Sequence, residues 1–86
     1  MKEIIVKLED ETGEGWVFNV EVDGLKYQVT LDKDYYQQLT KEERPPERLI
    51  EDSFIFLLQR EPKEAILRKF NLSEIQKHFS EFEIEI

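Results

Sequence analysis

Apolar and polar residues alternate along the first third of the chain, and this alternation predicts β-strands. Residues 3–9, 16–22 and 25–31 each place apolar side chains at every second position. Successive side chains of a strand point to opposite faces of a sheet. Each of the three segments is therefore predicted to be a strand with one buried face.

The dipeptide Asp23-Gly24 separates the second of these strands from the third. A two-residue type I′ turn requires positive φ at both central positions, and Asp-Gly is among the sequences that favour it. A turn at this position brings eight apolar residues into facing pairs on one side of the hairpin: Val22 with Leu25, Val20 with Tyr27, Phe18 with Val29, and Trp16 with Leu31. Turn chemistry and hydrophobic pattern therefore predict the same register.

Residues 46–61 have the hydrophobic period of a helix, and we expect this segment to be the central helix of the domain. Pro46 is suited to its first position, and Pro62 disfavours helical geometry at the residue before it. On a helical projection the apolar side chains cover an arc of roughly 200°, which is wider than the stripe of an ordinary surface helix. The arc consists of Leu49, Ile50, Phe54, Phe56, Leu57 and Leu58. The helix is therefore expected to be covered on more than one side.

Shorter patterns flank the central helix. A short helix is expected through Tyr35 and Leu39, followed by a connector at 41–45, and another short helix over 62–70. Ser73 and Gln76 have the spacing of a capping box that would open a further helix. The strictly alternating residues 81–86 predict a last strand beside residues 3–9, with Phe82, Ile84 and Ile86 facing inward.

These elements predict one α+β domain over residues 1–86. Its two layers would be a four-stranded, mostly antiparallel sheet in the order β-β-β-α-α-α-β, with the helices packed on one face. The stretch from Ser53 to Leu67 resembles a stretch of short, uncharacterised bacterial proteins of unknown function. That resemblance implies a small bacterial-type domain and brings no assigned activity or catalytic residue.

The charge balance bears on the kind of partner. Twenty acidic and twelve basic residues give a formal net charge of −8. An acidic surface repels phosphate backbones, so direct nucleic-acid binding is not expected. The N-terminal residues 1–9 contain no apolar run long enough for a signal peptide or a membrane span, so we expect a cytoplasmic protein without membrane contact.

Candidate catalytic chemistry is sparse. The chain has no cysteine and one histidine, His78, for which Glu74 is the local candidate partner as an orienting carboxylate. The acidic loop at 10–15 lacks the ligand spacing of an EF-hand. We therefore expect no enzyme activity, no catalytic residues, no cofactor and no metal site.

Two functional hypotheses from different classes remain. The first is a non-enzymatic protein-interaction or regulatory module that binds a protein partner or forms a homodimer. Its candidate surface consists of Ile5, Val17 and Ile55, which are apolar residues at positions expected to be solvated. A neighbouring short helix that covers Ile55 would provide an intramolecular explanation for that residue. The alternative is an acidic decoy that mimics nucleic acid and inhibits a basic partner, which would require rows of carboxylates on one face.

Overall fold

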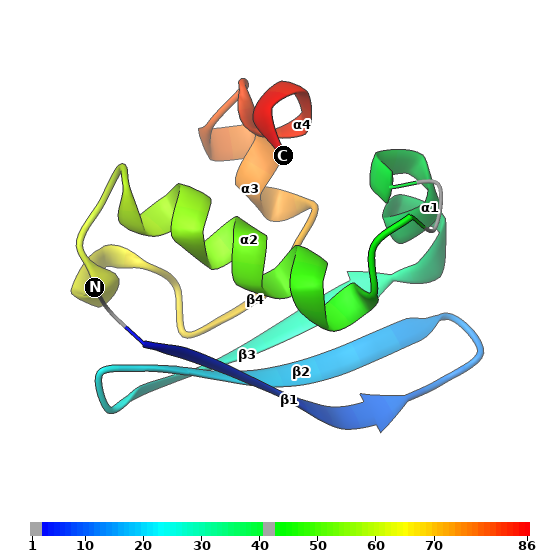
Figure 1. Cartoon of the computed structure of the whole chain (residues 1–86), viewed down its shortest axis with the longest axis horizontal. Coiled ribbons are helices and arrows are strands. Elements are labelled where there is room, and N and C mark those ends of the chain that lie inside the picture. The colour runs from blue at the N-terminus through cyan, green and yellow to red at the C-terminus, as the bar shows by residue number, and fades with distance from the viewer. Residues whose placement is uncertain (1–2, 41–42) are drawn as a thin grey trace.

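A computed structural model describes residues 3–40 and 43–86, and it confirms the α+β class. A four-stranded mixed sheet carries the helices on one of its faces (Figure 1). The strands are β1 (Ile4–Glu11), β2 (Gly15–Val22), β3 (Leu25–Asp32) and β4 (Lys69–Asn71). The helices are α1 (Lys33–Thr40), α2 (Pro46–Leu58), the short 3₁₀ helix η1 (Lys63–Ala65), α3 (Glu74–His78) and α4 (Phe82–Glu85).

The hairpin of β2 and β3 has the predicted register. Asp23 and Gly24 have φ angles of 47° and 85°, as a type I′ turn requires. Val22 faces Leu25, and the pairing continues without a shift to Trp16 and Leu31. The alternate side chains on one face, from Phe18 to Leu31, form the floor of the core, with Leu25 half-buried and the others buried: Phe18, Val20, Val22, Tyr27, Val29 and Leu31. The turn and the buried face therefore fix the register together.

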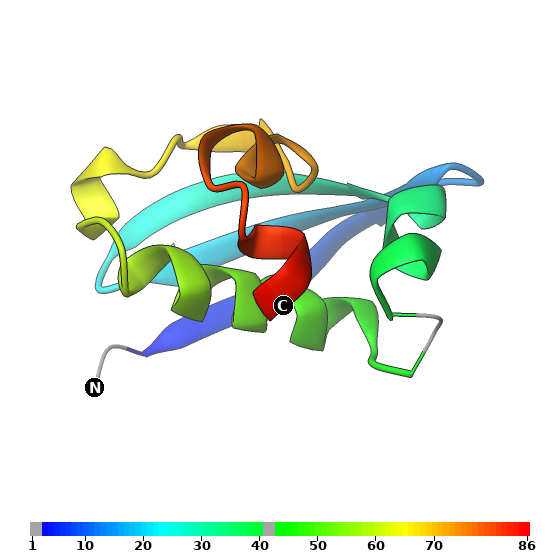
Figure 2. The ribbon, with the colours of Figure 1, turned by 90° about the horizontal axis from the view of Figure 1, so that it is seen from above.

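Helix α2 lies across this floor, over the side of the sheet that ends in β1 (Figure 2). Leu49, Ile50 and Phe54 are fully buried, and the Phe54 ring packs on Tyr27 at a centroid distance of 5.2 Å. The small buried residue Ser53 donates its hydroxyl hydrogen to the Leu49 carbonyl oxygen at 2.7 Å. A narrow residue at this point lets the helix pack closely without leaving a polar group unsatisfied.

The helix ends at Leu58, three residues before the predicted end at 61. The Arg60 amide bonds the Leu57 carbonyl oxygen at 3.0 Å, an i→i−3 bond that tightens the last turn. Pro62 is extended, with φ −68° and ψ 157°, and separates α2 from η1. The short helix predicted around Tyr35 and Leu39 is confirmed as α1. The predicted connector at 41–45 falls partly outside the described residues.

The last strand is not where the alternation placed it, and that prediction is wrong. Residues Phe82–Glu85 form α4, and the fourth strand is Lys69–Asn71, parallel to β3 at the opposite edge from β1. Phe82 is buried against the Phe56 ring at 5.1 Å, whereas Ile84 is 86% exposed. Contacts with α2 therefore override the period-2 pattern, because a helical turn places Phe82 and the half-buried Ile86 toward the core and leaves Ile84 outside.

The helix predicted over 62–70 differs from the structure, whereas the helix predicted after Ser73 is confirmed as α3. Only Lys63–Ala65 forms a 3₁₀ turn, and the following residues extend into β4. The Ser73 hydroxyl donates to the Asn71 side chain at 2.9 Å instead of capping α3, so the capping box does not form. The Glu74 carboxylate accepts the Asn71 amide at 2.8 Å, which holds the end of β4 against the start of α3.

Candidate functional site

An apolar cleft opens between the C-terminal end of α2 and helix α3. It has a volume of about 320 Å³, and we call it the α2–α3 cleft. Its apolar lining consists of Leu57, Ala65, Ile66, Leu67, Phe70, Ile75 and Phe79, and its polar lining of Glu61, Glu74 and His78. A concave, mainly apolar site with a few polar groups is the usual form of a binding pocket.

The segment after Pro62 forms one wall of the cleft, and the core holds this segment in place. The Tyr27 hydroxyl donates to the Lys63 carbonyl oxygen at 2.6 Å and so ties η1 to β3. Ile66 is buried, and Phe70 packs beside Phe54 at a centroid distance of 6.1 Å. Because Ile66 and Phe70 are both packed in the core, the residues between them form a loop that is held at both ends.

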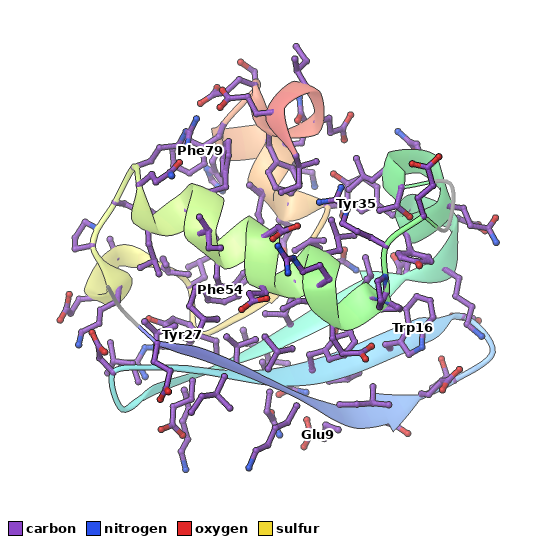
Figure 3. The ribbon with its side chains drawn as sticks, viewed as in Figure 1. Glu9, Trp16, Tyr27, Tyr35, Phe54 and Phe79 are labelled. Carbon is purple, nitrogen blue, oxygen red and sulfur yellow. The ribbon has the colours of Figure 1, made fainter. Side chains whose placement is uncertain are left out.

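Helix α3 forms the opposite wall. Ile75 is buried, and the Phe79 ring lies beside the C-terminal end of α2, 6.0 Å from the Phe56 ring in an edge-to-face arrangement (Figure 3). The Arg60 guanidinium lies 3.6 Å from the centroid of the same Phe56 ring. These contacts fix the distance between the two walls.

Leu67 is the residue that distinguishes the cleft from ordinary core. Its side chain is 56% exposed, although it adjoins the buried residues Ile66 and Phe70. Single exposed leucines are common, but one that lines an apolar hollow provides additional area for a ligand. The cleft therefore has a buried floor and an accessible apolar rim.

The titratable groups at the rim do not form an acid–base pair. Glu74 accepts a hydrogen bond from the Asn71 amide, and His78 is exposed. Across residues 3–40 and 43–86, no hydrogen bond or ion pair joins His78 to Glu74. The same residues contain no group of three or more His, Cys, Asp or Glu side chains placed to hold a metal ion.

The three residues predicted from the sequence as an interaction surface lie on two sides of the molecule. Ile5 is 37% exposed and Val17 is half-buried, and both face the side of the sheet that carries no helices. The facing pair Lys7 and Asn19 lies between them in the register. Ile55 is on α2, in the helix layer. The structure thus brings none of the three together with another.

Ile55 is 44% exposed, so a neighbouring short helix does not cover it. The intramolecular explanation for this residue is therefore wrong. It lines a second hollow of about 290 Å³ that is more polar than the α2–α3 cleft. In this hollow the Arg44 guanidinium bonds the Asp52 carboxylate and the Ile86 main-chain carbonyl oxygen, both at 2.8 Å. Arg44 is therefore occupied by its own chain.

The two adjacent tyrosines of α1 stabilise the fold. The Tyr36 ring is buried edge-to-face against Trp16 at 5.2 Å, and its hydroxyl bonds the Arg44 carbonyl oxygen. Tyr35 is half-buried, and its hydroxyl donates to the Glu83 carboxylate at 2.9 Å (Figure 3). Burial, together with this bond to Glu83, raises the pKa of Tyr35 above its ordinary value. Tyr35 therefore remains neutral and links α1 to α4.

Sequence reasoning missed the cleft because it treated residues 62–70 as one short helix. The sequence nevertheless contains a signal that could have indicated the cleft. Four apolar residues, Ala65, Ile66, Leu67 and Phe70, follow Pro62 within a segment too short to bury all of them on one helical face. The structure buries Ile66 and Phe70 and leaves Ala65 and Leu67 exposed.

Comparison of the chain with protein-family models, with curated proteins and with solved structures finds no match in any of the three. In the part of the chain that the structure describes, no helix is long and apolar enough to cross a membrane. The function proposed below therefore rests on the geometry of this chain alone.

Proposed function

We propose that the protein is a non-enzymatic protein-interaction module and that its α2–α3 cleft binds an apolar anchor side chain of a partner protein. The exposed Leu67 beside this apolar hollow is the observation that carries the proposal. A volume of about 320 Å³ is at the lower end for ligand pockets. It suits one or two side chains better than a large cofactor.

Burial supplies the energy for such a contact. An apolar side chain that moves from water into a hydrophobic site gains about 1.5–3 kcal/mol. Interfaces concentrate their binding energy in a few anchors that fill pockets. Contacts within the chain hold both walls of the cleft, at Phe79 and at Ile66.

The chemistry of the rim favours binding over catalysis. A catalytic site needs a nucleophile, or a base that a second group orients. Here the carboxylate of Glu74 is bonded to the main chain, and the imidazole of His78 faces solvent. Neither residue is held toward the apolar floor, so the cleft offers a bound group contact area and no positioned acid or base.

The acidic-decoy hypothesis is a less favoured alternative. It depends on carboxylates that are free to replace phosphates, and the net charge of −8 is its support. On the helix layer, however, Asp52 is paired with both Arg44 and Arg48. Glu81 and Glu85 are both paired with Arg60. These pairs neutralise the carboxylates locally, which favours the interaction module.

Display selection of random peptides tests the proposal. Peptides would be selected against the intact protein and then measured against Leu67→Asp and Ile84→Asp. Ile84 is a matched control because it is also apolar and exposed but does not line the cleft. We expect selected peptides to share one large apolar residue and to bind Leu67→Asp at least about tenfold more weakly.

Binding to Ile84→Asp should stay within about twofold of the wild type. The proposal would be wrong if both variants weakened binding equally, or if the selected peptides shared acidic or basic residues and no apolar one. Circular dichroism of both variants shows whether each is folded.

A further inference from the structure

Strand β1 forms one edge of the sheet, and its outer side is open. In the strand order β1-β2-β3-β4, its only neighbour among the described residues is β2. Figures 1 and 2 show no other segment alongside that outer side. Such an edge presents unpaired backbone N–H and C=O groups, which form a template for a further strand.

The helix-facing row of β1 is apolar and incompletely covered. Ile4, Val6 and Leu8 face the buried residues Val22, Val20 and Phe18 of β2. Ile4 and Val6 are half-buried, and Leu8 is 49% exposed. The core layer therefore continues to the edge of the sheet and stops there with apolar surface accessible. We call the segment Ile4–Leu8 the β1 edge.

Helix α2 supplies a wall above this edge. Phe56 marks the side of α2 that packs on Phe79 and Phe82. The residues on the opposite side of the helix are Glu47, Glu51 and Leu58. This second side therefore borders β1 with two carboxylates and one half-buried leucine. Among the described residues, the ion-pair partner of Glu51 is Arg48, at 4.0 Å.

Acidic residues also border the edge at its two ends. Glu3 precedes β1, and Glu9, Asp10 and Glu11 follow the β1 edge, whereas Lys7 is the only basic residue among them. Glu9 lies on the side of the sheet away from the helices (Figure 3). Glu11 is 3.8 Å from Lys33. The edge is thus an apolar row with a mainly negative border.

We infer that the β1 edge binds an extended peptide segment in which apolar residues alternate with lysine or arginine. Main-chain hydrogen bonds to β1 would provide affinity, and alternate side chains would provide specificity. The apolar residues of the segment extend the row of Ile4, Val6 and Leu8. The basic residues point to the face of the sheet away from the helices, where they meet the carboxylates of Glu3 and Glu9 at the two ends of the β1 edge. This surface does not include the α2–α3 cleft, so the inference does not depend on the function proposed for the cleft.

The length of the segment follows from the strand. Pairing of β1 with β2 is regular from Ile4 to Leu8 and shifts between Leu8 and Asp10. A bulge changes the local twist and ends regular pairing. The occupant therefore pairs over about five residues, the length of a typical short strand.

The net charge, and like charges in the registers centred on Val6 and on Lys7, disfavour a second copy of the chain as the occupant. If two copies paired in antiparallel fashion about a two-fold axis at Val6, Glu3 of each copy would lie opposite Glu9 of the other, at both ends of the new ladder. Pairing centred on Lys7 would place Lys7 opposite itself. Like charges directly opposite each other destabilise a ladder, and each copy also carries a net charge of −8.

Four synthetic peptides test the inference against the full-length protein by fluorescence polarisation and amide chemical-shift mapping. The first alternates valine and lysine over six residues, and the second groups the same residues in two blocks. The third alternates valine and glutamate, and the fourth is the first peptide with N-methyl groups at alternate main-chain nitrogens. We expect only the first to bind and to shift the amide signals of the β1 edge.

Charge-reversal variants locate the site. Glu3→Lys and Glu9→Lys should each weaken binding of the first peptide about fivefold. Glu64→Lys carries the same change of charge on the exposed turn η1 and should stay within about twofold of the wild type. The inference is overturned if the block peptide or the N-methylated peptide binds as well as the first, or if all three variants weaken binding equally. Shifts at the β1 edge that grow with protein concentration without peptide would also overturn it, because a second copy would then be the occupant.

Discussion

Helix α2 has two packed sides that are held by different forces. Toward the sheet, Leu57, Ile50 and Phe54 lie on the continuous apolar floor of β2 and β3. Toward the C-terminal segment, the contacts are the Phe56 ring against Phe79 and Phe82, and the ion pairs of Arg60 with acidic residues of that segment. The first side depends on burial and strand register, and the second on a few rings and charges.

This difference indicates which parts of the molecule can loosen without disrupting the rest of the fold. A sheet that is paired along eight-residue strands is disrupted as a unit, whereas a short segment attached by rings and ion pairs can loosen locally. The α2–α3 cleft lies between the two kinds of packing, since Leu57 contributes to its floor and Phe79 to its wall. Its floor is therefore expected to be more stable than its wall.

Truncation on the sheet side should have the largest effect. Leu57 is 3% exposed, so Leu57→Ala should leave a cavity and lower the free energy of unfolding by about 2–5 kcal/mol. Ile55→Ala on the exposed side of the same helix is the matched control and should change it by less than about 1 kcal/mol. Urea denaturation measures both values. Equal losses would mean that the two sides of α2 do not differ as described.

The turn between β2 and β3 should have the next largest effect. A Cβ atom at Gly24 or at Gly13 would meet no other atom within 4 Å, but only Gly24 has a positive φ, of 85°. Gly24→Val should therefore lower the free energy of unfolding by about 1–2 kcal/mol through backbone strain alone. Gly13→Val, measured by urea midpoint alongside it, should have a smaller effect. A Gly13→Val loss as large as that of Gly24→Val would contradict the position of the turn.

The C-terminal side of α2 should respond to pH. A hydrogen bond from its own backbone amide and the Arg60 guanidinium hold the pKa of Glu81 below its ordinary value of 4.5. This carboxylate therefore stabilises the fold above about pH 4.5, and the contribution is lost as the pH falls through the folded-state pKa. Glu81→Gln should lower the urea midpoint at pH 7.

As the pH falls from 4.5 towards 3, the difference in urea midpoint between the wild type and Glu81→Gln should shrink, because protonation removes the charge that Arg60 stabilises. Glu64→Gln, on the exposed turn η1, serves as the control and should change the midpoint little at either pH. A difference between Glu81→Gln and wild type that persisted unchanged at pH 3 would show that the pair does not hold α4.

The exposed side of α2 should show the smallest effect. Because Ile55 is 44% exposed, Ile55→Glu should keep the fold and change the free energy of unfolding by less than about 0.5 kcal/mol. If the protein forms a dimer through this side, the variant should be monomeric, since one substitution occurs twice in a two-fold interface. Light scattering and circular dichroism measure the two properties. An unfolded variant would show that Ile55 belongs to the core.

The hairpin and the central helix could be predicted from the sequence because local signals agreed there. Asp23-Gly24 and the alternation on either side of it specify one register, and Pro46 fixes the start of α2. The C-terminal region could not be predicted, because its structure depends on contacts between distant residues. Phe82 meets Phe56, and Arg60 bonds two carboxylates four residues apart, which favours a helical turn over the strand that alternation indicated.

The candidate sites were harder to predict than the fold. The cleft requires η1 and α3 to lie beside each other, and this arrangement follows from the Tyr27–Lys63 hydrogen bond and the position of β4. The open edge of β1 was not predicted, because residues 81–86 were expected to form a strand beside it. That segment folds as α4 against α2, and no strand among the described residues pairs with the outer side of β1.

The most direct test of the proposed interaction site is amide chemical-shift mapping of the full-length protein with N-acetyl-leucine amide, which carries one apolar anchor and no charge. We expect the largest shifts at residues of the α2–α3 cleft, above all Leu67, Phe70 and Phe79, and a loss of these shifts in Leu67→Asp but not in Ile84→Asp. Shifts spread evenly over the surface, or unchanged shifts in Leu67→Asp, would contradict the assignment of the cleft as a binding site.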